Sequence, residues 1–191
     1  MTIDDMKEQL KNMLHEERYR HSLGVAESAL QLAVQYRENE GEAVIAGLLH
    51  DCAKDISDDE LLFQCGKYGI EVDEVALANP RILHGRLGAE YAKRVFEIDD
   101  VRILDAIKTH TTGGENMNLL QKIIFLADFI EAGRKFEGAD KLRKLAFEDL
   151  DKAVLEGLDL TIISVLRRGR LLHSDTVKAR NYLLLSQGRS C

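Results

Sequence analysis

Proline is almost absent from this chain: Pro80 is the only one in 191 residues. Long segments on either side carry apolar residues at the three-to-four-residue spacing of amphipathic helices, and none shows the convincing alternation of a half-buried strand. Since proline breaks helices, its rarity agrees with that spacing. The sequence therefore predicts an all-α chain, folded as a helical bundle of about eight or nine helices.

The expected helices follow from apolar spacing, glycine breaks and capping residues. They cover residues 3–13, 17–38, 42–54, 57–68, 83–96, 99–110, 118–132, 139–168 with an interruption near 148, and 175–186. Ser57 with Glu60 forms the pattern of a capping box, and Gly69 is expected to end the helix that starts there. No linker, repeat or low-complexity segment appears, so we expect one domain over residues 1–191.

Composition limits the class of partner. The 33 acidic and 26 basic side chains give a net charge of −7, which argues against non-specific binding of long nucleic acid. A small phosphate ligand needs only a local cluster of cations. The first 20 residues carry acids, and no run of 18 apolar residues occurs, so we expect neither signal peptide nor membrane span, and a cytoplasmic location. Cys52, Cys65 and Cys191 lack the number and spacing of a disulfide framework or a thiolate zinc site.

The segment 42–54 is apolar almost all round, which is typical of a central buried helix. His50, Asp51 and Lys54 are nevertheless part of it, and on a continuous helix they share one side. Burying an ionised carboxylate beside an imidazole is costly unless hydrogen bonds or a cation satisfy both groups. A metal ion at this position would satisfy them.

Two further polar residues interrupt apolar helix faces. Asp128 has apolar neighbours three and four residues before it and one after it; the alternative to a functional role is an Asp that caps a helix or pairs with a lysine. His21 is in line with Val25 and Ala29 on an apolar stripe, with Arg18 one turn earlier. Taken alone, such a histidine is more often a core residue.

His84 and His110 complete the set of candidates. Taken alone, a histidine at either position is more often a structural or surface residue. The order His21, His50-Asp51, His84, His110, Asp128 carries more weight, because a divalent ion prefers imidazole and carboxylate ligands brought together from several helices.

This order resembles the HD-domain superfamily of metal-dependent phosphohydrolases. The resemblance implies an HD-type helical bundle in which His21, His50, Asp51 and Asp128 hold one metal ion. In members with two metals the middle histidines, here His84 and His110, bind the second ion with a bridging Asp51. Without a second ion, these two histidines would face the substrate phosphates as hydrogen-bond donors or as a general acid.

Four segments narrow the resemblance to the YqeK group of bacterial HD proteins. They are HDCAKD at 50–55, LHG at 83–85, IKTHTTG at 107–113 and LADFIE at 126–131, followed by Arg134. The similarity extends over almost the whole chain and implies symmetrical hydrolysis of diadenosine tetraphosphate to two ADP. It implies catalytic roles for Lys54, His84 and His110. The nucleotide contacts that it implies are Arg18, Lys54, His84, His110, Thr111 and Arg134.

A basic loop precedes the last expected helix. Arg167, Arg168 and Arg170 lie in or beside it, and backbone amides at the start of a helix form an anion site that Ser174 is expected to cap. The functional interpretation is a nucleotide clamp formed by Arg170, Leu171, Leu172, His173, Ser174 and Asp175. The alternative is a solvated basic helix end that complements the dipole of the preceding helix.

The expected mechanism is hydrolysis by a metal-activated water. Lys54 would neutralise charge on the phosphoryl oxygens, Arg18 and Arg134 would hold the phosphates, and one of the middle histidines would assist departure of ADP. Two histidines and two carboxylates fit iron first, and also manganese or cobalt, with zinc left open.

Other interpretations of the sequence are an HD-type nucleotidase or nucleoside triphosphate hydrolase, a non-catalytic nucleotide or metal sensor, and a helical interaction module. Residues 183–185 cover either a homodimer partner or the chain's own core.

Overall fold

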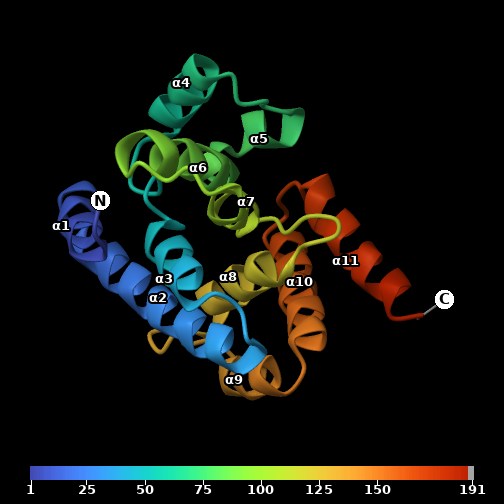
Figure 1. Ribbon diagram of the computed structural model, residues 1–191. Coiled ribbons are helices and arrows are strands. Elements are labelled where there is room, and N and C mark those ends of the chain that lie inside the picture. Colours follow the sequence, from blue (N-terminus) through green and yellow to red (C-terminus); the bar gives the residue numbers. More distant parts are fainter. Residues whose placement is uncertain (189–191) are drawn as a thin grey trace.

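The computed structural model describes residues 1–188, which form eleven α-helices and one short 3-10 helix (Figure 1). The helices are α1 (Ile3–Met13), α2 (Glu16–Tyr36), α3 (Glu40–Leu49), α4 (Asp58–Tyr68), α5 (Glu74–Ala78), η1 (Pro80–Leu83), α6 (His84–Val95), α7 (Val101–Thr109), α8 (Leu119–Ile130), α9 (Ala139–Glu148), α10 (Leu150–Arg167) and α11 (Ser174–Ser186). No strand occurs in residues 1–188, so the all-α prediction is confirmed.

The expected number of eight or nine helices is wrong. The five-residue helix α5 was not predicted; it begins after Asp73, whose side chain accepts a hydrogen bond from the Ala76 amide. The segment 139–168 is two helices, because Asp149 adopts extended backbone (φ −154°, ψ 98°) and caps α10 by accepting from the Lys152 amide. The interruption predicted near residue 148 is thus confirmed, whereas α5 depends on a capping aspartate that apolar periodicity does not reveal.

Helix α8 lies at the centre of the bundle (Figure 1). It contacts α2, α3, α7, α9 and α10. Its residues Ile123–Ala127 are fully buried, and Asn118 starts the helix with a capping box completed by Gln121. The half-buried Asp128 near the end of α8 is therefore held in a fixed position by the buried residues before it.

A second, smaller apolar cluster lies under α4 and α6 (upper part of Figure 1). Its members include Leu61, Cys65 and Leu87. Helix α4 starts and ends where the sequence predicts: Ser57 accepts from the Glu60 amide, and Gly69 takes the left-handed conformation (φ 66°). Cys52 and Cys65 are buried free thiols, while Cys191 lies outside the described residues.

The helix expected over 42–54 ends earlier than predicted. Helix α3 stops at Leu49, and residues 50–55 form consecutive turns. Their hydrogen bonds join residues three apart, from the Cys52 amide to the Leu49 carbonyl and from the Lys54 amide to the Asp51 carbonyl. His50, Asp51 and Lys54 therefore do not lie on one continuous helix, yet their side chains still meet: Asp51 Oδ2 lies 3.5 Å from His50 Nε2, and Asp51 Oδ1 lies 3.7 Å from Lys54 Nζ.

The end of the chain packs on α10 through α11. Leu183 is buried in the core, whereas Leu185 is 73% exposed. Within residues 1–188, no helix combines the length and apolar character that crossing a membrane requires.

Close packing of α2 on α3 fixes the position of the turns that follow α3. A Cβ at Gly47 would lie 2.9 Å from the Ala26 Cα, so the two helices touch backbone to backbone. We expect Gly47→Ala to lower the free energy of unfolding by roughly 1–3 kcal/mol, because α2 must move to admit the methyl group. Urea unfolding followed by circular dichroism measures this change.

The matched control is Gly66→Ala on α4, where nothing lies within 4 Å of the new Cβ. There the lower conformational entropy of alanine in the unfolded chain should raise stability by about 0.5–1 kcal/mol. Equal effects of the two substitutions would contradict the close-contact interpretation.

Candidate functional site

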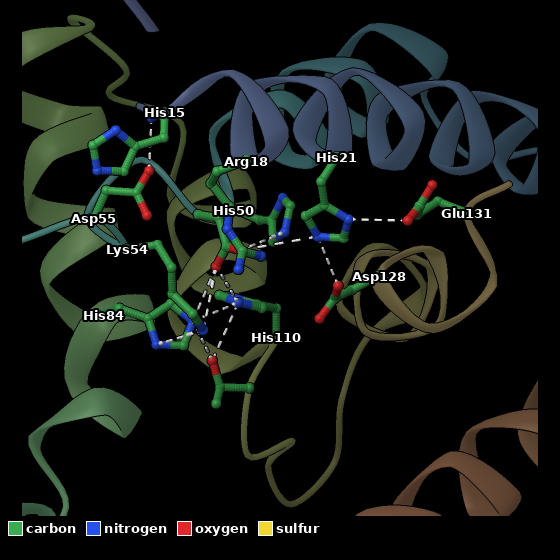
Figure 2. Close-up of polar contacts among 12 residues, drawn as sticks. His15, Arg18, His21, His50, Lys54, Asp55, His84, His110, Asp128 and Glu131 are labelled. Carbon is green, nitrogen blue, oxygen red and sulfur yellow. Dashed lines mark hydrogen bonds and ion pairs between the residues drawn. The ribbon is translucent and has the colours of Figure 1, made fainter. Parts of the chain in front are cut away.

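Six polar residues from five segments meet beside α8 (Figure 2). All are sequence-predicted ligands, and three-residue groups among them place one ligand atom each within 4.8 Å of one another. The residues are His21 on α2, His50 and Asp51 in the turns after α3, His84 at the start of α6, His110 after α7, and Asp128 on α8. We call them the His/Asp cluster.

Asp51 joins the two halves of the His/Asp cluster. Its Oδ2 lies 3.5 Å from His50 Nε2 and 3.9 Å from His21 Nε2. Its Oδ1 lies 3.0 Å from His84 Nε2 and 3.5 Å from His110 Nε2. The two carboxylate oxygens thus face two different sets of imidazoles, which is the arrangement that a carboxylate shared by two ligand sets requires.

The four histidines are oriented alike. In each ring Nδ1 contacts a fixed oxygen outside the cluster, and Nε2 points into it (Figure 2). The oxygens are the carbonyls of Gly47, Arg81 and Ile107 for His50, His84 and His110, and the Glu131 carboxylate for His21. Because a carbonyl only accepts, the proton of a neutral ring stays on Nδ1 and Nε2 keeps its lone pair.

Two buried atoms of the His/Asp cluster make no hydrogen bond within residues 1–188. They are His50 Nε2 and Asp51 Oδ1, and both residues are at most 2% exposed. Leaving buried polar atoms unpaired is unfavourable by about 1–3 kcal/mol each. Imidazole nitrogens and carboxylate oxygens are ligands of borderline divalent cations, so these residues fit such an ion.

The charge states also suit a cation. Burial alone raises the pKa of Asp51, but His50, His110 and His84 outweigh burial and hold that pKa well below its ordinary value. Burial likewise raises the pKa of Asp128, yet the contact with His21 and the nearby charges bring it well below the ordinary value. Both carboxylates are therefore ionised at neutral pH.

Lys54 and Thr111 lie at the His84 end of the cluster. Lys54 Nζ is 2.9 Å from His84 Nε2, and Thr111 Oγ1 is 3.0 Å from the same atom. Burial and the Lys54 charge lower the pKa of His84 to about 4, so this imidazole is neutral at pH 7. Burial also lowers the pKa of Lys54. A lysine that is easier to deprotonate here faces a neutral imidazole.

Two arginines border the other end. Arg18 Nη1 donates to Asp51 Oδ2 at 2.8 Å. Arg134 donates from Nε to the Asp128 carbonyl at 2.8 Å and from Nη2 to the Asp128 carboxylate. Both sequence-predicted arginines therefore meet the cluster and compensate its negative charge.

Glu131 is a residue that the sequence reasoning passed over. Its carboxylate lies 3.1 Å from His21 Nδ1 and accepts a 2.6 Å hydrogen bond from the Gly133 amide. Gly24 makes room for it, since a Cβ there would lie 2.8 Å from Glu131 Oε2. The available signal was an acidic residue directly after an apolar helix, three positions beyond Asp128.

The residues of the predicted clamp, 170–175, join α10 to α11. The expected Ser174 cap is wrong: His173 caps α11, because its extended backbone lets Nδ1 accept from the Asp175 amide at 3.1 Å. His173 also pairs with Asp73 at 2.8 Å, and Asp175 pairs with Arg86 at 3.2 Å. These contacts tie the loop to the α5–α6 region rather than to the His/Asp cluster.

The other members of the predicted clamp are mostly open to solvent. Arg170, Leu171 and Ser174 are exposed, and Leu172 is half-buried. None of these four makes a side-chain hydrogen bond or an ion pair within residues 1–188. The clamp therefore stays a prediction.

Comparison with known proteins identifies the family. The HD domain family matches residues 18–133. A symmetrical bis(5'-nucleosyl)-tetraphosphatase of Halalkalibacterium halodurans is 38% identical over 178 residues, 93% of this chain and 95% of that protein. The protein of the same name from Bacillus subtilis is 34% identical over 175 residues, 92% of this chain and 94% of that protein.

A crystal structure agrees with the sequence comparisons. It is described as a predicted HD superfamily hydrolase involved in NAD metabolism from Clostridium acetobutylicum, with a TM-score of 0.95 and 47% identity. The match covers 97% of this chain and 98% of that one. The chain thus belongs to the HD-domain family, in the YqeK-like group represented by these symmetrical bis(5'-nucleosyl)-tetraphosphatases.

Proposed function

We propose that this protein is a metal-dependent hydrolase that cleaves diadenosine tetraphosphate at the middle of its bridge to give two ADP. The observation that carries the proposal is the His/Asp cluster, in which four imidazoles and two ionised carboxylates converge with their Nε2 and Oδ atoms facing one another. The names of relatives that are 34–38% identical over at least 92% of the chain supply the substrate.

We assign one divalent cation to His21, His50, Asp51 and Asp128. The donor set favours iron, with manganese or cobalt as alternatives. The chemistry that such a cation supplies when bound is activation of water and polarisation of a phosphoryl oxygen. The geometry of Asp51, with each oxygen facing a different imidazole set, supports a second ion held by Asp51, His84 and His110.

The proton balance separates the roles of Lys54 and His84. His84 is neutral, and its Nδ1 donates its proton to the Arg81 carbonyl. Its Nε2 therefore carries a lone pair, which suits a metal ligand better than a general acid. Lys54 is the cationic proton donor at this end, and its lowered pKa favours transfer of a proton to the departing phosphate. We therefore assign charge neutralisation and proton donation to Lys54.

Phosphate binding falls to the remaining cations. Arg18 uses Nη1 on Asp51, and Arg134 uses Nε and Nη2 on Asp128, which leaves further N–H groups of each guanidinium for phosphate oxygens. Thr111 Oγ1, beside His84, offers a hydroxyl to the same phosphates. We propose that the clamp of residues 170–175 binds the nucleoside attached to these phosphates.

A second candidate follows from the solved relative described as involved in NAD metabolism. A pyrophosphate-linked dinucleotide presents the same kind of bond between two nucleosides.

The test is to incubate metal-replete protein with diadenosine tetraphosphate and separate the products by ion-exchange chromatography. ADP alone supports the proposal; ATP with AMP overturns symmetrical cleavage. If diadenosine tetraphosphate is not cleaved but a mononucleotide or NAD is, the cleaved compound is the substrate instead.

Three further properties predicted from the sequence belong to the same proposal. We propose one domain over residues 1–191 and a cytoplasmic location, without nucleic acid or membrane partners, and we keep a homodimer as one of the two uses of residues 183–185. Leu185 at the surface of α11 is an apolar contact that a second copy would cover.

A matched pair of variants separates metal binding from turnover. His50→Ala removes a buried cluster imidazole, so we expect it to lose both bound metal and activity. Lys54→Ala should keep the metal and lower kcat by about 10²–10⁴-fold, because it removes only the proton donor. Metal analysis by mass spectrometry beside steady-state kinetics gives both values. Full activity of His50→Ala would contradict the metal assignment. Loss of metal in Lys54→Ala would mean that Lys54 maintains the structure of the site.

Glu131 is expected to position His21. Glu131→Ala should weaken metal affinity by about 10–100-fold, because the His21 ring loses the partner that fixes its orientation and tautomer. Competition with a chelator measures that affinity without turnover. Glu131→Gln keeps an oxygen acceptor and should recover part of it, while Glu115→Ala, at an exposed site, should change nothing. An unchanged affinity in folded Glu131→Ala would show that His21 needs no such support.

A further inference from the structure

A cavity of about 640 Å³ adjoins the His/Asp cluster on the side of Asp128. It lies between the end of α8, the loop before α9 and the second half of α10; we call it the α8–α10 cavity. Asp128 and Arg134 form its inner edge, so it opens directly onto the cluster. The assigned roles of metal ligands, lysine and clamp leave this space without a function.

One wall of the α8–α10 cavity is apolar. Phe129, Phe136, Leu160 and Ile163 line it. Phe136 is 37% exposed and Ile163 is 43% exposed, although both lie in a concave site where a ligand would cover them. Two aromatic rings and two aliphatic side chains suit a flat, partly apolar group such as a nucleobase.

The rim of the α8–α10 cavity carries three arginines and one further acid, Glu137, so cations predominate there. Arg134 lies on the side of the cluster, and Arg167 and Arg168, at the end of α10, line the same space. Within residues 1–188 neither Arg167 nor Arg168 forms an ion pair, so both guanidinium groups are available to an anion. An apolar wall beside free cations matches the two halves of a nucleotide, the base and its phosphates.

The cluster has two ends, and the substrate has two nucleosides. Lys54 and Thr111 contact His84 at one end, whereas Arg134 contacts Asp128 at the other. Cleavage at the middle of a four-phosphate bridge leaves one nucleoside on each side of the reacting phosphorus. The clamp proposed at residues 170–175 accommodates only one of them.

We propose, on the basis of the function proposed above, that the α8–α10 cavity binds the second nucleoside diphosphate half of the substrate. Its base lies against Phe129 and Phe136, and its phosphates lie between Arg134 and Arg167. The cavity thereby sets the register of the bridge, because a molecule with nucleosides at both ends is bound on both sides of the cluster.

The first test uses Phe136→Ala with Phe63→Ala as the matched control, since Phe63 is 66% exposed on α4 and outside the cavity. The substrates are diadenosine tetraphosphate and adenosine 5'-tetraphosphate, which lacks the second nucleoside. Loss of a base–aromatic contact should raise KM for the dinucleotide about ten-fold in Phe136→Ala, with kcat nearly unchanged. KM for adenosine 5'-tetraphosphate should stay at the wild-type value.

Two results overturn the assignment. An equal rise in KM for both substrates means that the cavity does not distinguish the second nucleoside. A rise equal to that of Phe63→Ala means that the cavity contacts neither substrate.

The second test is independent of turnover. Calorimetric titration of metal-replete protein with ADP should give two ADP per chain. Ile163→Asp places a carboxylate in the cavity and should reduce this to one, whereas Leu166→Asp, exposed on the same helix but outside the lining, should leave two. A single ADP per wild-type chain overturns the proposal even if cleavage is symmetrical. Two ADP per chain, reduced by Ile163→Asp, support it even if diadenosine tetraphosphate is not cleaved.

Discussion

The carboxylate of Asp51 is the group around which the rest of the structure is arranged. It is 2% exposed, and polar contacts reach it from four directions: His50 beside it in the chain, His21 and Arg18 from α2, His84 with Lys54, and His110. An ionised carboxylate at that depth is stable only where opposing charge and donors surround it. The fold therefore has to deliver imidazoles and cations from distant segments to one point.

Most of the imidazoles around Asp51 come from the ends of helices. His50, His84 and His110 lie at or directly next to a helix terminus, where each Nδ1 faces the carbonyl three residues earlier. A residue in mid-helix would compete there with the backbone ladder, whereas at an end the carbonyl is free to accept. The backbone contact of Gly47 with Ala26 holds the end of α3 against α2, and so fixes where His50 and Asp51 enter the cluster.

The sequence predicted the helical class, and breaks in apolar helix patterns indicated His21, His50, Asp51 and Asp128, whereas His84 and His110 were added by the order of the residues and the resemblance to HD-domain proteins. It misplaced features that depend on a single local bond. The end of α3 at Leu49 and the His173 cap each follow from one hydrogen bond or turn that periodicity does not encode, whereas the break at Asp149 agrees with the interruption predicted near residue 148. Glu131 and the α8–α10 cavity depend on contacts between segments far apart in sequence, which one sequence does not specify.

Electrostatics explains how a chain with net charge −7 can suit a polyanion. The cations near the site are not in excess in this structure: Arg18 and Arg134 neutralise Asp51 and Asp128, and Lys54 lies 3.7 Å from Asp51. A divalent cation at those carboxylates would take over their neutralisation and leave both guanidinium groups to bind phosphate. The affinity for phosphate would then depend on cation occupancy, so the acidic cluster and the basic rim act as one binding unit.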